Sequence, residues 1–319
     1  MNIKRTRTYM ILGMALLLSM RLFANSGWAD EREVLSFVSV EDRTRPIILM
    51  DTQGKILQEL VIPDLTQLSM SWSPDGRSFT YHAIHNQVPN LDFDIYVMDV
   101  ETQTSRRLTL DDGLDIWPAW APNGKWISFA SNRAGTSNLY RMDVDGGNLM
   151  KLTDGIGYDK TAWSPDSQWI AFTSRAALFV MTAEGKKLKR LTGNAHGVDC
   201  TWSLDGEKIA FSANNGIFSI GVNGKNLRQL TQLDQRVWSL TWSPSGEWIA
   251  YRLTDVFDDL VVGVVNTVDS KRGGVLEATR GLKPLYLDWV PEAFFSVSPS
   301  TEKQTTLWGR LKQTENTSK

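Results

Sequence analysis

The sequence contains little of the chemistry on which most redox, metal and hydrolytic sites depend. Its 319 residues include one cysteine and three histidines, so the chain cannot form an internal disulfide. It has no Gly-x-Ser-x-Gly turn, no His-Glu-x-x-His, no Cys-x-x-Cys and no Gly-rich phosphate loop followed by lysine. These absences exclude the enzyme classes that such motifs identify.

The sequence also has no excess of charge of one sign. It carries 34 basic and 36 acidic residues, a formal net charge of −2, and the two signs alternate along the chain. A nucleic-acid-binding protein needs a basic block or face. We therefore expect no nucleic-acid partner.

Tryptophan, by contrast, is abundant and regularly placed. Six of the 13 tryptophans open a short turn, as in Trp72-Ser-Pro-Asp-Gly. They are Trp72, Trp120, Trp163, Trp202, Trp242 and Trp289, at spacings of 48, 43, 39, 40 and 47 residues. A period near 40 is that of one four-stranded propeller blade, whose apolar faces only its neighbours can bury.

Each period also contains the turn signals of antiparallel strands. Proline presets the backbone of the Trp turn, and we expect Asp75 and Asp205 to cap the turns in which they lie. Hairpin turns are predicted at Asp145-Gly146, Glu184-Gly185 and Asn223-Gly224. No segment has a sustained helical period, so the sequence predicts an all-β fold.

The two ends of the repeat region complement each other. Three strands, within 34–38, 46–51 and 56–61, precede the first Trp turn, and residues 284–289 form an innermost strand with no full blade after it. Joined, they make one composite blade, which together with five complete blades predicts a six-bladed β-propeller. Closing the ring in this way removes an exposed sheet edge.

The chain outside the repeats predicts export. Lys4, Arg5 and Arg7 precede an apolar run over residues 9–20, and small residues lie before Asp30. This pattern is typical of a secretory signal peptide over 1–29, with an uncleaved N-terminal anchor as the alternative. We expect a monomeric propeller over 30–296, a polar flexible tail over 297–319, and no stable membrane span after cleavage.

Isolated reactive residues favour ordinary structural roles. Cys200 lies two residues before Trp202, where other repeats carry apolar residues, so we expect it to be buried. His82 and His85 are expected in a long loop over 82–94, where they are more often solvated than metal ligands. The sequence gives no catalytic residue.

A functional site is expected at one mouth of the central channel. The loops that enter each innermost strand share that face with the loops after each second strand, and loops on a rigid scaffold commonly bind partners. The candidate residues are Asp115, Trp117, Arg133, Asp159, Asp199, Arg236 and Trp238. Asp115, Asp159 and Asp199 could together hold calcium, or could simply cap strands and stay hydrated.

The repeat phrase resembles a known family. Trp-Ser-Pro-Asp-Gly, then Trp-Ile-Ala-Phe, then Asn138-Leu-Tyr-Arg-Met-Asp, is similar to the propeller repeats of TolB-like proteins over about residues 34–291. TolB carries an additional N-terminal α/β domain, so we expect a propeller of this type without that domain. The resemblance implies a periplasmic or secreted protein of the Tol-Pal kind that binds a protein or peptide, with calcium possible in the channel.

Two functions remain open from the sequence. The first is a non-enzymatic binding or scaffold propeller that holds a protein or peptide at the loop-rich mouth. The second is a metal-assisted hydrolase or lyase acting there on a sugar or lactone. Binding faces use aromatic and arginine anchors, and Trp117, Trp238 and Arg236 favour the first.

Overall fold

The fold was analysed in a computed structural model of the chain. The structure describes residues 33–40, 45–61, 67–86, 92–111, 113–155, 160–175, 177–193, 199–213, 216–233, 237–255, 257–291 and 293–296. The predicted signal peptide and the predicted tail over 297–319 therefore lie outside the described residues.

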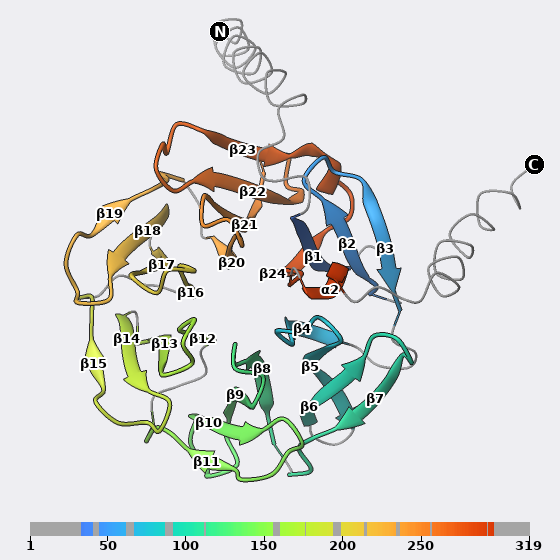
Figure 1. The fold of residues 1–319 in the computed structure, drawn as a ribbon, viewed down its shortest axis with the longest axis vertical. Coiled ribbons are helices and arrows are strands. Elements are labelled where there is room, and N and C mark those ends of the chain that lie inside the picture. Colours follow the sequence, from blue (N-terminus) through green and yellow to red (C-terminus); the bar gives the residue numbers. More distant parts are fainter. Residues whose placement is uncertain are drawn as a thin grey trace, which may run out of the picture.

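Six four-stranded antiparallel sheets surround a central axis, as predicted (Figure 1). Helical structure among the described residues is confined to the 3-10 turn η1 (Glu277–Thr279) and the single turn α2 (Ala293–Ser296). None of the helices in the described part of the chain is long and apolar enough to cross a membrane. The molecule is an all-β, six-bladed propeller.

The strands follow one order in five consecutive blades, from the innermost to the outermost. The first two complete blades consist of β4 (Gln67–Trp72), β5 (Ser78–Asn86), β6 (Asp92–Asp99) and β7 (Thr104–Arg107), then β8 (Asp115–Trp120), β9 (Trp126–Ser131), β10 (Asn138–Asp143) and β11 (Met150–Lys151). The third and fourth blades consist of β12 (Thr161–Trp163), β13 (Trp169–Ser174), β14 (Ala177–Thr182) and β15 (Lys189–Arg190), then β16 (Cys200–Trp202), β17 (Lys208–Ala213), β18 (Gly216–Gly221) and β19 (Arg228–Gln229). The fifth blade consists of β20 (Trp238–Trp242), β21 (Trp248–Thr254), β22 (Leu260–Asn266) and β23 (Gly273–Leu276).

The composite blade closes the ring as the sequence predicts. Its strands are β24 (Pro284–Trp289), β1 (Val34–Ser39), β2 (Ile47–Asp51) and β3 (Ile56–Leu60), in that order from the axis outward. Strand β24 pairs antiparallel with β1, with Leu35 opposite Trp289 and Val38 opposite Leu285. The first and last described strands thus lie side by side (Figure 1).

Apolar side chains between neighbouring blades form the core. In the cluster between the second and third blades, Ala130 and Leu139 pack with Ile170, Phe172 and Met181, all nearly inaccessible to solvent. Equivalent clusters occur between other neighbours, because each sheet presents one apolar face to each side. The buried Cys200 belongs to one of these clusters, which confirms its predicted position.

The Trp turns are built as the sequence predicts. Asp75 Oδ1 accepts hydrogen bonds from Ser73 Oγ at 2.6 Å and from the Arg77 amide at 3.0 Å. Asp205 Oδ1 accepts the same pair of bonds from Ser203 Oγ and the Glu207 amide. These aspartates cap their own turns, as predicted.

The prediction of a long loop over 82–94 is wrong at both ends. Strand β5 continues through His82 to Asn86, and β6 already begins at Asp92. His82 is 3% exposed, and its Nδ1 lies 3.2 Å from the Trp117 amide nitrogen of the next blade. The strand extends because this bond and the pairing of His82 with Ile95 satisfy the backbone across two blades.

Candidate functional site

The central channel is a cavity of about 480 Å³ lined by all six innermost strands. At the Trp-turn face its rim is formed by the residues two positions after each repeated tryptophan, namely Pro74, Pro122, Pro165, Leu204, Pro244 and Pro291. The cavity therefore extends to the Trp-turn face of the disc, which is opposite to the loop-rich face.

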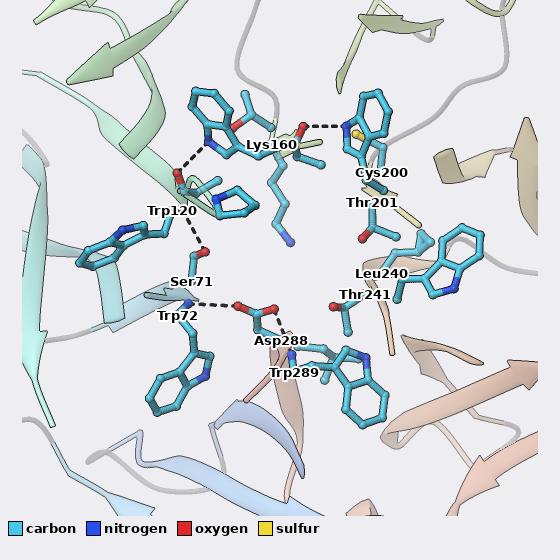
Figure 2. Close-up of a pocket in the computed structure, with 18 of the residues that line it drawn as sticks. Ser71, Trp72, Trp120, Lys160, Cys200, Thr201, Leu240, Thr241, Asp288 and Trp289 are labelled. Atoms are coloured by element: carbon cyan, nitrogen blue, oxygen red, sulfur yellow. Dashed lines mark hydrogen bonds between the residues drawn. The ribbon is translucent and has the colours of Figure 1, made fainter. Parts of the chain in front are cut away.

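Two positions of each repeat supply the channel wall. The residue one before each tryptophan and the residue three before it lie on the same side of the strand, because side chains alternate along a β-strand. The first set is Ser71, Ala119, Ala162, Thr201, Thr241 and Asp288, and the second is Ser69, Trp117, Lys160, Asp199 and Tyr286. In the fifth blade the second position is Ser239, which is buried and does not line the cavity. Figure 2 shows Lys160, Thr201, Thr241 and Asp288 of this wall directed toward the axis.

A charged pair and an aromatic ring narrow the channel on its loop-rich side. Lys160 Nζ donates to Asp199 Oδ2 at 2.9 Å, and it also lies 5.5 Å from the centre of the Tyr286 ring. Lys160 belongs to the third blade and Tyr286 to the composite blade, which are opposite each other in the ring. Their contact therefore spans the axis.

Asp199 is the best-bonded carboxylate of the wall. It is 3% exposed, and it accepts the Cys200 amide on Oδ1 and the Leu240 amide of the next blade on Oδ2. With the Lys160 ammonium it thus has three donors. This carboxylate joins three blades and has little capacity left for a ligand.

Asp288 is the second carboxylate of the wall and has no ion pair among the described residues. Its Oδ2 accepts the Trp72 amide at 3.2 Å and its Oδ1 accepts the Trp289 amide at 3.0 Å (Figure 2). Burial raises the pKa of Asp288 to about 6, against the opposing effect of these amides and of Lys160. The carboxylate is therefore largely ionised at neutral pH and available to the channel.

Backbone strain accompanies the wall at three equivalent positions. Trp117, Ser239 and Tyr286 have φ values of 54°, 53° and 52°, in the left-handed region that non-glycine residues rarely occupy. At each of them the register between the innermost strand and its neighbour shifts by a bulge. Bulges re-aim side chains next to functional sites, and here they turn the tryptophan and tyrosine rings toward the channel.

Aromatic and cationic side chains continue onto the loop-rich face. Trp238, at the start of β20, is 42% exposed, and its ring lies 5.8 Å from the Arg252 guanidinium carbon. Arg252 Nε is buried and has no hydrogen-bond partner among the described residues. Burial also lowers the pKa of Arg252. Arg252 thus lies beside the exposed Trp238 ring with one guanidinium N–H unbonded within the described part of the chain.

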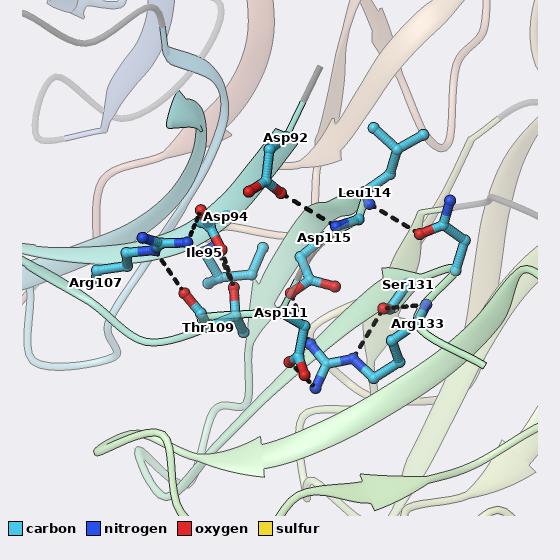
Figure 3. A network of polar contacts seen from close by, with 12 residues as sticks. Asp92, Asp94, Ile95, Arg107, Thr109, Asp111, Leu114, Asp115, Ser131 and Arg133 are labelled. Atoms are coloured by element: carbon cyan, nitrogen blue, oxygen red, sulfur yellow. Dashed lines mark hydrogen bonds and ion pairs between the residues drawn. The ribbon is translucent and has the colours of Figure 1, made fainter. Parts of the chain in front are cut away.

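Asp115 and Arg133 form a separate network between the first and second blades (Figure 3). Arg133 binds Asp115 Oδ2 at 2.6 Å through Nη2 and Asp111 Oδ2 at 2.8 Å through Nη1. Asp94 and Arg107 form a second ion pair beside it, at 2.6 Å. Burial raises the pKa of both Asp94 and Asp115. The network does not line the channel cavity.

The predicted site residues therefore fall into three groups. Trp117 and Asp199 line the channel, Trp238 lies at its loop-rich end, and Asp115 pairs with Arg133 in the network between two blades. Asp159 and Arg236 lie outside the described residues. Within the ranges that the structure describes, no three His, Cys, Asp or Glu side chains are grouped so that they could hold a metal ion.

Lys160, Tyr286 and Asp288 are wall residues that were not among the predicted site residues. All three lie one or three residues before a repeated tryptophan. The two-residue period of a strand, counted back from each tryptophan, would have found them. The sequence contains no comparable signal for Arg252, because the feature that distinguishes it is its contact with the Trp238 ring on the neighbouring strand.

Comparisons with known proteins place the chain in a family. The family model described as the TolB beta propeller domain matches residues 14–178, which is just over half of the chain. An uncharacterized protein of Agrobacterium fabrum is 41% identical over 95 residues, covering 30% of this chain and 31% of the relative. The Tol-Pal system protein TolB of Desulfotalea psychrophila is 28% identical over 123 residues, covering 38% of this chain and 27% of the relative. The matched region thus spans less than a third of the length of each of these relatives.

Solved structures share the fold. TolB from Acinetobacter baumannii superposes with a TM-score of 0.67 at 23% identity, over 82% of this chain and 67% of that one. An oligogalacturonate lyase from Vibrio parahaemolyticus superposes with a TM-score of 0.51 at 14% identity, over 76% and 72%. With its six blades, its repeated Trp turns and the family match, the chain belongs to the TolB beta-propeller family.

Proposed function

We propose that the chain is an exported, non-enzymatic binding propeller that holds a protein or peptide partner at the loop-rich mouth of its channel. The observation that carries the proposal is the pairing of the exposed Trp238 ring with Arg252, whose buried Nε lacks a partner among the described residues. Tryptophan, tyrosine and arginine are the residue types that dominate binding energy in protein interfaces.

The channel wall supports the same function from within. Below Trp238, the Tyr286 ring, the Trp117 ring and the Lys160 ammonium lead into the cavity. A peptide side chain that enters from the loop-rich side would meet aromatic faces and one ammonium group before it reaches Asp288. Export and a periplasmic or secreted location are part of the proposal, and they rest on the N-terminal pattern of residues 1–29 and on the family.

Calcium in the channel mouth is a further part of the proposal. Asp115 and Asp199 are each bound by a basic side chain, so a calcium ion would have to displace Arg133 and Lys160 from them. Asp159, the third predicted ligand, lies outside the described residues. Calorimetric titration of calcium into the chelator-treated protein, beside an Asp115→Ala, Asp159→Ala, Asp199→Ala variant, tests this part separately.

A metal-assisted hydrolase or lyase at the channel mouth is the weaker alternative. The oligogalacturonate lyase superposes with a TM-score of 0.51, against 0.67 for TolB from Acinetobacter baumannii. At 14% identity that likeness concerns the fold alone. The binding function is therefore the one that the observations favour.

Co-purification tests the binding function. The tagged chain and a Trp238→Ala, Arg252→Ala variant would be cross-linked reversibly in cells, purified, and compared for the proteins that they retain. We expect a discrete partner that is lost or reduced on the order of 30-fold in the variant, as for interface residues worth about 2 kcal/mol or more. A Lys55→Ala, Arg77→Ala variant, altered away from the mouth, is the matched control. Equal retention by all three forms would contradict the proposal.

A further inference from the structure

Three neighbouring blades expose the same leucine. Leu149, Leu188 and Leu227 are 46%, 51% and 59% exposed and lie 39 residues apart. Each follows a residue in the left-handed conformation, Asn148, Lys187 or Asn226, at the end of the hairpin turn between the third and fourth strands. Because they occupy one position of the repeat, the three leucines lie at the same height along the propeller axis.

Contacts between blades make these positions continuous. Lys189 Nζ of the third blade donates to the Asn223 carbonyl of the fourth at 2.9 Å. Arg228 of the fourth blade donates to the Val268 carbonyl of the fifth at 2.7 Å, and Val268 is 78% exposed. We call the outer surface formed by residues 148–154, 184–190, 223–229 and 268 the rim band.

The rim band is basic, although the chain as a whole is slightly acidic. Residues 148–154, 184–190 and 223–229 carry seven basic side chains and two acidic ones, whereas the complete chain has a net charge of −2. The acids Asp154 and Glu184 already have the partners Lys151 and Arg141, the latter at 4.0 Å. Among the described residues, no acid forms an ion pair with Lys186, Lys187 or Lys225, and all three are exposed.

Protection of sheet edges does not account for this composition. Lysines on outer strands prevent edge-to-edge pairing, but that role needs no exposed leucines beside them. In the first blade the position equivalent to Leu149 is Ser105, and its neighbours Thr102, Gln103 and Thr104 are polar. Exposed apolar residues lie between unpaired lysines at one height along the axis. This arrangement complements a flat surface that is anionic and partly apolar.

We propose that the rim band docks the propeller onto an anionic lipid bilayer. The leucines and Val268 would enter the boundary between headgroups and acyl chains, and the lysines would lie among the anionic headgroups. The rim band follows hairpin turns on the Trp-turn side of the disc, so docking would leave the loop-rich mouth facing away from the bilayer. This inference does not depend on the proposed function of that mouth.

Vesicle co-sedimentation of the full chain tests the proposal. The protein would be mixed with vesicles of neutral phosphatidylcholine and with vesicles that also contain anionic phosphatidylglycerol. We expect binding to the anionic vesicles only, and a decrease as salt is raised. A Lys186→Glu, Lys187→Glu variant should bind at least about 30-fold more weakly, since each basic residue near such a surface contributes about one kcal/mol of attraction.

A leucine variant and a matched control make the test specific. Leu188→Ser, Leu227→Ser should weaken binding by about tenfold or more through lost apolar insertion. Arg175→Glu, Lys283→Glu, with the same change of charge on loops of the opposite, loop-rich face, should bind as the unaltered chain does. All of these residues are exposed, and equal melting temperatures would show that the variants are folded.

Three results would overturn the proposal. They are equal binding to neutral and anionic vesicles, an equal loss in the control, and a loss in the lysine variant with none in the leucine variant. The last of these would identify the rim band as a surface for a soluble polyanion instead of a bilayer.

Discussion

At the scale of single residues, the positions just before the six repeated tryptophans decide the chemistry of the channel. Five of the residues directly before a tryptophan are serine, threonine or alanine, and the sixth is Asp288. Three residues before the tryptophan, the same strands carry Lys160 and Asp199, which neutralise each other. The net charge of the wall therefore depends on the protonation of Asp288.

The pH dependence of stability should reveal the buried state of Asp288. Its folded pKa of about 6 lies above the usual value near 4, so the folded protein binds the proton more tightly than the unfolded chain does. Ionisation then costs stability as pH rises from about 4 to about 6. We expect the unaltered chain to lose roughly 2 kcal/mol over this range relative to an Asp288→Asn variant.

Urea denaturation of both proteins at several pH values measures this difference. A stability difference that does not change between acid and neutral pH would show that Asp288 titrates normally. An Asp154→Asn variant is the control, because the Asp154 side chain is exposed and its one ion pair, with Lys151, lies on the surface.

At the scale of elements, the sequence predicted what local chemistry determines. The Trp turns, the hairpin turns at Gly146, Gly185 and Gly224, and the strands between them were predicted because proline, aspartate and glycine act within a few residues. The extension of β5 through His82 was not predicted, because the Trp117 amide that donates to His82 belongs to the next blade. Bulges at Trp117, Ser239 and Tyr286 were missed for the same reason, since they depend on the neighbouring strand.

The aspartate of a Trp turn should contribute measurably to stability. Asp205 accepts bonds from Ser203 Oγ and the Glu207 amide, and the Ser203 bond is the main cause that holds the pKa of Asp205 below its usual range. Asp205→Ala should lower the free energy of unfolding by about 1 kcal/mol at neutral pH, with the exposed setting limiting the effect.

The sign of the pH dependence checks this mechanism. Because the folded pKa of Asp205 is depressed, its contribution is present above pH 4 and is lost as pH falls below it. Denaturation at neutral pH and near pH 3 should therefore show a smaller difference between the two proteins in acid. Asp154→Ala, which removes only an exposed pair with Lys151, should leave stability nearly unchanged at both pH values.

At the scale of the whole molecule, closure of the ring could be predicted from the sequence, whereas the positions of the candidate site residues could be predicted only in part. Three strands at one end and one at the other required a composite blade, and β24 pairs with β1 as expected. Trp117, Asp199 and Trp238 lie at the channel, but Asp115 and Arg133 are joined in a network beside it. The repeat spacing predicts the strand on which a residue lies, but it does not predict the side chain with which that residue forms an ion pair.

Removal of β24 should prevent the propeller from folding. A chain that ends before Pro284 leaves the inner edge of β1 without its partner, and it also loses the Asp288 carboxylate that binds the Trp72 amide of the first blade. We expect aggregation and no cooperative thermal transition, because an open ring exposes a sheet edge. Circular dichroism melts compare it with a chain that ends after Ser296, which keeps every described strand. Normal melting of the shorter chain would show that closure is dispensable.

The central claim, that a partner is held at the loop-rich mouth, is tested most directly by site-specific photocrosslinking at position 238. A photoreactive phenylalanine analogue would replace Trp238 in the full chain in cells, and the same analogue at Lys55 on the composite blade would be the control. The account predicts one discrete adduct with a protein from position 238, reduced when Arg252 is also changed to alanine, and none from position 55. The same adducts from both positions, or no adduct from position 238, would contradict it.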